Sequence, residues 1–104
     1  MKVAVLGFGV VGQGVYEMLR TCPLFEAGPV LVRPGKADAP FKVDDIDKIV
    51  NDDSVDAVAE VMGGVDVAYA YGVKALKAGK HFVTSNKALV SARGVELAAL
   101  AREN

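Results

Sequence analysis

The sequence contains little cysteine, few aromatic residues and no run of basic residues, and each absence excludes a class of protein. Cys22 is the only cysteine among 104 residues, so a disulfide framework is excluded. The formal net charge is −1 and there is no basic run, which removes the electrostatic basis for binding nucleic acid. No apolar stretch approaches the roughly 20 residues of a membrane-spanning helix. We therefore expect neither nucleic acid nor a membrane as a partner.

The amino-terminal segment carries no targeting signal. Met1 leads through a short apolar run directly into a glycine-rich loop, which leaves no room for a signal peptide. We therefore expect a cytoplasmic protein. The single histidine, His81, begins an apolar segment and is expected to be structural, and we expect no metal site.

Short apolar segments alternate with segments of helical periodicity along the chain. The length suits one domain, residues 1–104. Cys22-Pro23 ends the first helix, because the residue before proline disfavours helical backbone angles. Gly79 suits the position just after a helix. The predicted strands are 3–6, 29–33, 56–62 and 81–84, and the predicted helices are 10–20, 44–51, 66–78 and 93–102, with a loop over 34–41.

This alternation predicts an α/β fold, with a parallel sheet covered by helices on both faces. Asp44 or Asp45 is expected to cap the second helix, and Asp66 the third. The abundance of Ala, Val and Gly fits buried parallel strands, and it also fits a docking surface for a further domain. Because the last helix has no strand after it, we expect a truncated or isolated cofactor domain.

A glycine-rich loop joins the first predicted strand to the first helix. Its G-x-G-x-x-G pattern, in a strand–turn–helix context, is typical of Rossmann-like dinucleotide-binding folds. Gly7 permits a tight turn, Gly9 lets the backbone approach a pyrophosphate, and Gly12 lets helix and strand pack closely. The helix N-terminus adds N–H donors and a partial positive charge. The alternative is that the glycines serve packing alone. The loop consists of Gly7, Phe8, Gly9, Val10, Val11 and Gly12.

The end of the second predicted strand bears on the type of cofactor. NAD-binding versions of this fold usually place Asp or Glu about 20 residues after the loop, where it holds the ribose 2′-hydroxyl. Arg33 stands there instead, with Lys36 close behind. A charge-assisted contact with a 2′-phosphate is worth about 1.5–3 kcal/mol, so we expect NADP(H) to be favoured over NAD(H). Alternatively, Arg33 is a solvated strand-end residue, or it occupies the phosphate site itself.

A polar tetrapeptide, Thr84-Ser85-Asn86-Lys87, follows the last predicted strand. Open α/β sheets bind ligands outside the carboxyl ends of their strands. We therefore expect these residues at the dinucleotide site, with Lys87 at its reactive end. An amine beside the reacting carbon can move the proton of an alcohol. The alternative for Lys87 is an exposed lysine at the start of a helix.

Five blocks of the sequence fall in the order and at the spacing of a known family. They are residues 7–15, 32–33, 60–64, 75–81 and 84–89. Together they resemble the amino-terminal cofactor domain of homoserine dehydrogenase, and the E-V-M-G-G and T-x-N-K-A-L blocks are the most specific. The resemblance implies NAD(P)-dependent interconversion of L-homoserine and L-aspartate 4-semialdehyde, in the biosynthesis of threonine and methionine.

The resemblance also implies roles for individual residues. The loop over 7–12 would hold the pyrophosphate, and Arg33 with Lys36 would meet the 2′-phosphate. A second glycine-containing segment would line the cofactor, and a third segment would lie near the nicotinamide ribose. The lining residues are Met62, Gly63 and Gly64, and the ribose residues are Thr84, Ser85 and Asn86. Lys87 would face the substrate and take part in proton transfer, as the catalytic residue.

Two departures from the family pattern stand out, Ser85 in place of a common alanine and Val67 in place of a common proline. Neither removes a chemical group that the reaction needs. The resemblance further implies a substrate and dimerisation domain that this chain lacks. We therefore expect the chain to be inactive alone. Its expected partners are a small-molecule substrate and the missing domain, within a homo-oligomeric parent protein.

Other interpretations remain open at this level. The chain could be a stand-alone NADP-binding sensor or regulatory module without catalysis. It could also belong to another semialdehyde or imino-reductase family that shares the glycine loop. Glu60 lies in an apolar segment, where it could orient a loop or contact the substrate. Tyr69 and Tyr71 are expected to pack within a helix rather than stack on a cofactor.

Overall fold

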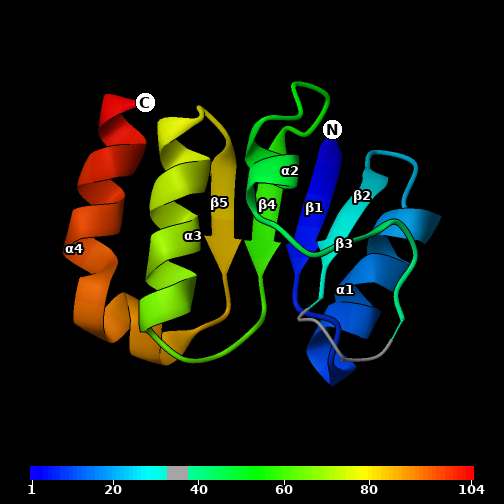
Figure 1. Ribbon diagram of the computed structural model, residues 1–104, viewed down its shortest axis with the longest axis horizontal. Helices are drawn as coiled ribbons and strands as arrows, with labels where there is room; N and C mark the ends of the chain where they lie inside the picture. The colour runs from blue at the N-terminus through cyan, green and yellow to red at the C-terminus, as the bar shows by residue number, and fades with distance from the viewer. Residues whose placement is uncertain (33–37) are drawn as a thin grey trace.

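The computed structural model describes residues 1–32 and 38–104 and contains a parallel sheet in the order β3-β2-β1-β4-β5 (Figure 1). Every pairing in this sheet is parallel. The predicted α/β, Rossmann-like class is therefore confirmed. The strands are β1 (Lys2–Leu6), β2 (Glu26–Leu31), β3 (Lys42–Val43), β4 (Ala57–Glu60) and β5 (His81–Thr84), and the helices are α1 (Val10–Thr21), α2 (Asp47–Val50), α3 (Asp66–Lys77) and α4 (Lys87–Glu103).

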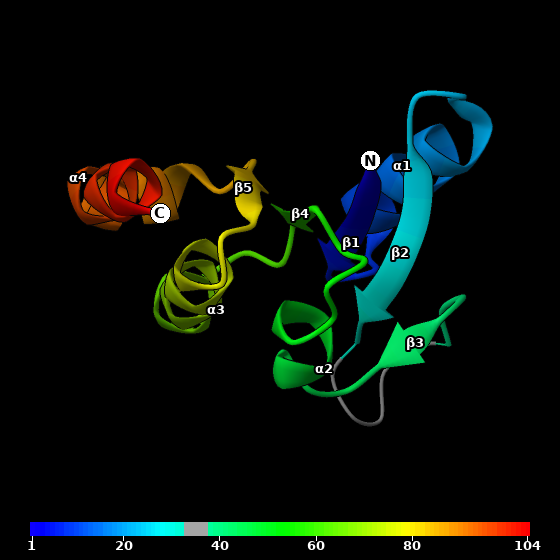
Figure 2. The ribbon, with the colours of Figure 1, turned by 90° about the horizontal axis from the view of Figure 1, so that it is seen from above.

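The central strand β1 is apolar on both faces because helices cover both sides of the sheet. Successive side chains of a strand point to opposite faces. Val3 and Val5 pack with α1, whereas Ala4 and Leu6 pack on the opposite side with residues of α2 and α3. Figure 2 shows α1 on one face, α2 and α3 on the other, and α4 beside α3 near the β5 edge.

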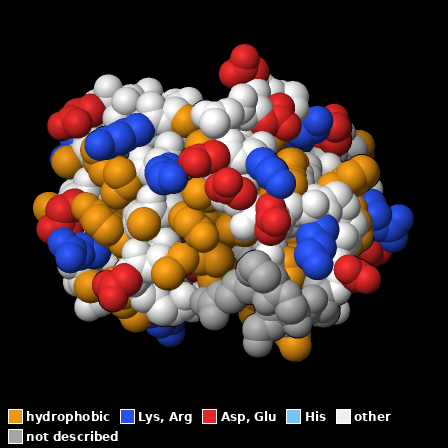
Figure 3. Space-filling model, viewed as in Figure 1, with side chains coloured by type: hydrophobic (Ala, Val, Ile, Leu, Met, Phe, Trp, Pro, Cys, Tyr) orange, Lys and Arg blue, Asp and Glu red, His pale blue; other side chains and the backbone are white. Residues whose placement is uncertain are grey.

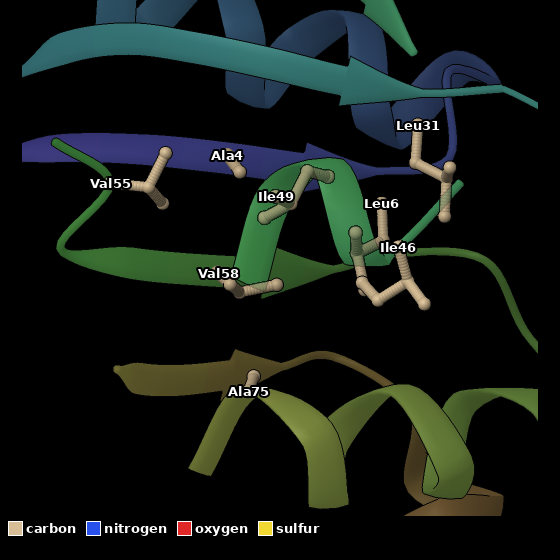
Figure 4. Packing of buried hydrophobic residues seen from close by; sticks show 8 residues of the cluster. All are labelled: Ala4, Leu6, Leu31, Ile46, Ile49, Val55, Val58 and Ala75. Carbon is tan, nitrogen blue, oxygen red and sulfur yellow. The ribbon is translucent and has the colours of Figure 1, made fainter. Parts of the chain in front are cut away.

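The core between the sheet and α2 is formed by buried apolar side chains. Ile49 of α2 is fully buried and points toward Ala4 and Val58 on neighbouring strands (Figure 4). A separate cluster joins α3 to α4. It contains Ala68, Leu76, Leu89 and Leu97.

The outer surface of α2 is charged and solvated. Lys48 Nζ lies 3.0 Å from Asp44 Oδ1, and Lys74 Nζ of α3 lies 3.0 Å from Asp47 Oδ1. The hydrogen bond from Lys48 lowers the pKa of Asp44 below its ordinary value. Figure 3 shows acidic side chains gathered over this helix, with basic ones among them. Asp44 and Asp47 therefore pair with lysines on the solvated side of this helix.

The second strand differs from its prediction over 29–33. It starts at Glu26, and its register with β1 shifts between Val3 and Val5. Ala27 pairs with Val3 and Val30 with Val5, so β2 has one more residue than β1 over this stretch. A bulge of this kind leaves one residue unpaired, which accommodates the missing N–H of Pro29.

The short elements also differ from prediction. β3 was not predicted, because two residues are too few to show a period, and α2 is shorter than the expected 44–51. Its N-cap is Ile46 rather than Asp44 or Asp45, so that prediction was wrong, although Asp45 accepts a 2.9 Å hydrogen bond from the backbone N–H of Asp47. Asp66 is the first residue of α3 rather than its cap, so that prediction was wrong. α4 begins at Lys87, earlier than the predicted 93–102.

Candidate functional site

The carboxyl ends of three neighbouring strands lie in one row. Leu6 of β1 pairs with Glu60 of β4, and Glu60 pairs with Thr84 of β5. The loops that follow these strands therefore emerge at the same edge of the sheet (Figure 1). The chain leaves β1 for β2 on one side, while β4 lies on the other. This is the switch point at which open α/β sheets bind ligands.

Gly7 and Gly12 hold the first loop against the helix that follows it. Gly7 has φ +99°, which favours glycine, and its N–H donates to the carbonyl of Leu31 at 2.9 Å. A Cβ added at Gly12 would lie 2.3 Å from the carbonyl oxygen of Gly7. The structural reasons predicted for these two glycines, a tight turn and close helix–strand packing, are therefore confirmed.

Gly9 has no such structural reason. Its φ of −78° and ψ of −158° are extended angles that other residues adopt, and a Cβ added there would meet no atom of the described residues within 4 Å. It is the N-cap of α1 and has no side chain to bond the first backbone N–H groups of the helix. Those groups have no partner within the helix itself, and the helix dipole adds partial positive charge there.

Of the residues next to Gly9 in the sequence, one packs against the core and the others are exposed to solvent. Phe8 packs against the core, with its ring edge-on to Tyr16 at 5.9 Å between centroids. The side chain of Gln13 donates to the carbonyl of Phe8 at 3.3 Å. Val10 and Val11 are exposed at the start of α1. The loop is thus anchored on one side and open on the other.

The loop after β4 lies against the glycine loop. A Cβ added at Gly7 would lie 3.1 Å from Cγ of Met62, so the two loops touch. Gly63 and Gly64 have φ values of +84° and +78° and are both exposed. The structure therefore brings these predicted lining residues to the same edge as the first loop, with little side chain above them.

Glu60 orients this second loop. Its side chain is 0% exposed. Oε2 accepts hydrogen bonds from the backbone N–H groups of Met62 at 2.8 Å and Gly63 at 3.4 Å. Oε1 accepts a 2.5 Å hydrogen bond from the hydroxyl of Thr84. Of the two roles left open by the sequence, orienting a loop is the one that these contacts support.

Asn86 connects the third loop to the second. Its backbone N–H donates to Thr84 Oγ1 at 3.0 Å, and its side-chain Nδ2 donates to the carbonyl of Gly64. Its Oδ1 accepts from the backbone N–H of Leu89 at 3.0 Å, which caps α4. Lys87 is the first residue of α4 and is exposed, as is Ser85.

Glu60, Met62, Gly63, Gly64, Thr84 and Asn86 are called the strand-end network below. Sequence reasoning placed most of them at the site but missed how they bond to one another. The signal available was local. Asn86 precedes a helical run, which is typical of an N-cap, and Thr84 lies two residues before it. The contacts of Glu60 with β5 arise from strand pairing, which no local pattern reveals.

The remaining predicted residues lie elsewhere. Arg33 and Lys36 fall outside the described residues. His81 begins β5, at the opposite end of the strand from Thr84. Among residues 1–32 and 38–104, no group of three or more His, Cys, Asp or Glu is placed to hold a metal ion. Within the same ranges, no helix is long and apolar enough to cross a membrane.

A family model and sequence relatives of this chain identify one family. A family model described as the NAD-binding domain of homoserine dehydrogenase matches residues 7–104. Homoserine dehydrogenase of Bacillus subtilis is 36% identical over 100% of this chain, which covers 28% of that protein. A crystal structure of homoserine dehydrogenase from S. aureus matches with a TM-score of 0.85 and 31% identity, covering 99% of this chain and 30% of that one.

A further solved structure comes from another enzyme. Biliverdin reductase from Synechocystis, in complex with biliverdin and NADP⁺, matches with a TM-score of 0.82 and 26% identity. The match covers 98% of this chain and 34% of the reductase. The chain thus spans about a third or less of the length of each of these relatives.

Proposed function

This chain belongs to the family of homoserine dehydrogenase NAD-binding domains, and from that premise we propose that it binds its dinucleotide across the carboxyl ends of β1, β4 and β5. Gly9 is the observation that carries this proposal. Within residues 1–32 and 38–104, neither the backbone angles nor the packing requires a glycine at this position, which lies at a helix N-terminus. A ligand that approaches the backbone closely accounts for the glycine.

The residues present fit a dinucleotide in two parts. At the α1 end, the first N–H groups of the helix would bond the pyrophosphate, with Gly9 giving it access. At the β4–β5 end, the exposed backbone of Gly63 and Gly64 would accept a flat ring without a side chain in the way. Thr84 and Asn86 would contribute by fixing the loops, since their side-chain groups are engaged with other residues. The exposed Ser85 is free of that constraint.

The bound dinucleotide would supply hydride transfer. We propose L-homoserine and L-aspartate 4-semialdehyde as the substrate pair, in the route to threonine and methionine, because the relatives are homoserine dehydrogenases. Lys87, exposed beside the network, would exchange the proton of the substrate hydroxyl. We propose that the rest of the substrate site, and the contacts of a homo-oligomer, come from regions that these longer relatives have outside the matched part. The chain by itself would then be inactive.

The proposed cofactor preference rests on the sequence. Arg33 stands where an acidic residue would select NAD(H), so we propose that NADP(H) binds more tightly. Calorimetric titration of the chain with NADPH and NADH tests this directly. We expect NADPH to bind about ten- to a hundredfold more tightly, and Arg33→Ala to remove the difference. An unchanged preference in Arg33→Ala would contradict the role of Arg33.

The proposed reaction needs a separate test. A longer protein that joins this chain to a homoserine dehydrogenase substrate region should reduce NADP⁺ only when L-homoserine is added. Lys87→Ala should lower this turnover while leaving the affinity for NADPH close to that of the unmodified protein, because the proposed role of Lys87 is on the substrate side. Absence of homoserine-dependent turnover would contradict the proposed reaction but not dinucleotide binding.

A further inference from the structure

We propose that Glu60 is a positioning residue that couples the β4 and β5 loops, so that the nicotinamide end of the site and the start of α4 are placed as one unit. This rests on the proposed function, since it concerns the same site. The observation behind it is a buried carboxylate that bonds to both loops at once.

The first step of the argument is the burial of Glu60. A carboxylate that is fully buried is costly unless its oxygens accept hydrogen bonds. The donors here are the backbone N–H groups of Met62 and Gly63 and the hydroxyl of Thr84. If either loop moves away, an acceptor of this charged group loses its partner, so the carboxylate opposes independent motion of the two loops.

The second step is that the hydrogen bonds of the strand-end network form a closed cycle between the two loops. Thr84 Oγ1 donates to Glu60 and accepts from the backbone N–H of Asn86. The Asn86 side chain then returns to the carbonyl of Gly64, in the loop that Glu60 already holds. The loops are therefore joined at two places, near the strand ends and near their tips. Closed sets of hydrogen bonds resist deformation more than single bonds do.

The third step connects the strand-end network to Lys87. Asn86 caps α4 through Leu89, so the start of that helix is fixed by the same side chain that bonds Gly64. Lys87 is the next residue along the chain. The glycine loop of β1 touches the β4 loop at Met62, but it has supports outside the network as well, namely the hydrogen bond from Gly7 to Leu31 and the packing of Gly12 against the carbonyl of Gly7. Loss of the network should therefore affect the nicotinamide end and spare the pyrophosphate end.

Thr84→Val is the variant that tests the coupling, because it keeps the shape of the side chain and removes the hydroxyl. Thr84→Ser is the matched control, since it keeps the hydroxyl. We expect Thr84→Val to weaken binding of NADPH about tenfold, while 2′-phospho-ADP-ribose, which lacks nicotinamide, binds as it does to the unmodified chain. Thr84→Ser should behave as the unmodified chain with both ligands. The proposal would be overturned if Thr84→Val bound both ligands more weakly to the same extent, or bound both as tightly as the unmodified chain does.

Amide hydrogen exchange gives a second readout that needs no ligand. The N–H of Met62 bonds to Glu60 rather than to Thr84, so a purely local role of Thr84 would leave its exchange unchanged. We expect exchange at Met62 to quicken at least about tenfold in Thr84→Val, together with that of Asn86. A response at Asn86 alone would overturn the coupling. Absence of dinucleotide binding by the unmodified chain would instead contradict the proposed function, and this exchange experiment would still decide the coupling.

Discussion

Two glycines of one motif, Gly9 and Gly12, serve different purposes in this chain. Gly12 is needed by the fold, because any side chain would collide with the backbone of Gly7. The described part of the fold does not require Gly9, because its angles are ordinary and none of the described residues would contact a Cβ there. The motif therefore contains one position explained by packing and one for which we propose a ligand outside the chain.

The packing role of Gly12 makes a prediction with a control in the same helix. Gly12→Ala should lower the free energy of unfolding by about 1–3 kcal/mol, because its Cβ would overlap the carbonyl of Gly7. Gly14→Ala places a Cβ on α1 where nothing lies within 4 Å, so it should raise stability by about 0.5–1 kcal/mol. Urea denaturation of the three proteins measures both effects. Equal stability of the two variants would contradict the packing account.

Residue roles could be predicted from sequence only where they depend on nearby residues. The roles of Gly7 and Gly12 in turn and packing followed from a motif six residues long. The role of Glu60 did not, because it depends on the pairing of β4 with β5 and on a hydroxyl 24 residues away. The preference for NADP(H) over NAD(H), which was assigned to Arg33, stays a prediction.

At the scale of elements, the segment between α2 and β4 is held by a buried lysine. Lys80 lies just before β5 and is 7% exposed. Its Nζ donates to the carbonyls of Asp52 at 2.9 Å and Val55 at 2.7 Å. The lysine therefore ties this segment to the turn that follows α3. The sequence offered no sign of this contact, because lysine is ordinarily an exposed residue.

Removal of this amine should be costly. Lys80→Met keeps most of the stem but leaves two carbonyls without their donor, so we expect a loss of about 1.5–3 kcal/mol in the free energy of unfolding. Lys77→Met, at an exposed position on the end of α3, should change stability by less than about 0.5 kcal/mol. Chemical denaturation compares them. A Lys80→Met protein as stable as Lys77→Met would show that these hydrogen bonds contribute little.

The same segment carries a pH-dependent contact. The side-chain and backbone hydrogen bonds from Ser54 lower the pKa of Asp52 below its ordinary value. A lowered pKa contributes stability above the pKa of the unfolded state, about 3.9, and this is lost as the pH falls through the folded value. Ser54→Ala should raise the Asp52 pKa toward its ordinary value, as NMR titration would show. The difference in stability between Ser54→Ala and the unmodified chain should therefore shrink as the pH falls. An unchanged Asp52 pKa would contradict this assignment.

Element prediction succeeded where a segment was long enough to show its period. α1, α3 and β1 were placed within one residue at their ends, and β5 was placed with both ends correct. β3 has only two residues, and β2 contains a bulge at Gly28-Pro29 that interrupts the expected alternation. The early start of α4 was missed because Lys87, its first residue, had been assigned to the polar tetrapeptide of the site.

At the scale of the whole molecule, one face of the sheet is only partly covered. α1 packs over β1 and β2, and beside it an apolar hollow of about 470 Å³ opens over β4 and β5. Val83 lines it and is 62% exposed. The hollow lies on the face of the sheet, whereas the candidate site lies at the carboxyl edge.

An open apolar surface of this kind should bind a hydrophobic dye. We expect anilinonaphthalene sulfonate to fluoresce with the folded chain, and Val83→Lys to reduce this signal severalfold. Val95→Lys, on α4 at a position 82% exposed and outside the hollow, is the control and should not reduce it. Equal dye binding by the two variants would show that the hollow is not the surface that the dye contacts.

The central claim is that a dinucleotide occupies the open space at Gly9, and the affinity of Gly9→Asp for NADPH tests it most directly. Aspartate is a favourable N-cap beside the positive end of a helix, so the thermal midpoint should stay level or rise. Its carboxylate would take the N–H groups offered to the pyrophosphate and repel the anion. We predict at least about tenfold weaker binding of NADPH by a protein that is no less stable. Unchanged affinity in a folded Gly9→Asp chain would contradict the account.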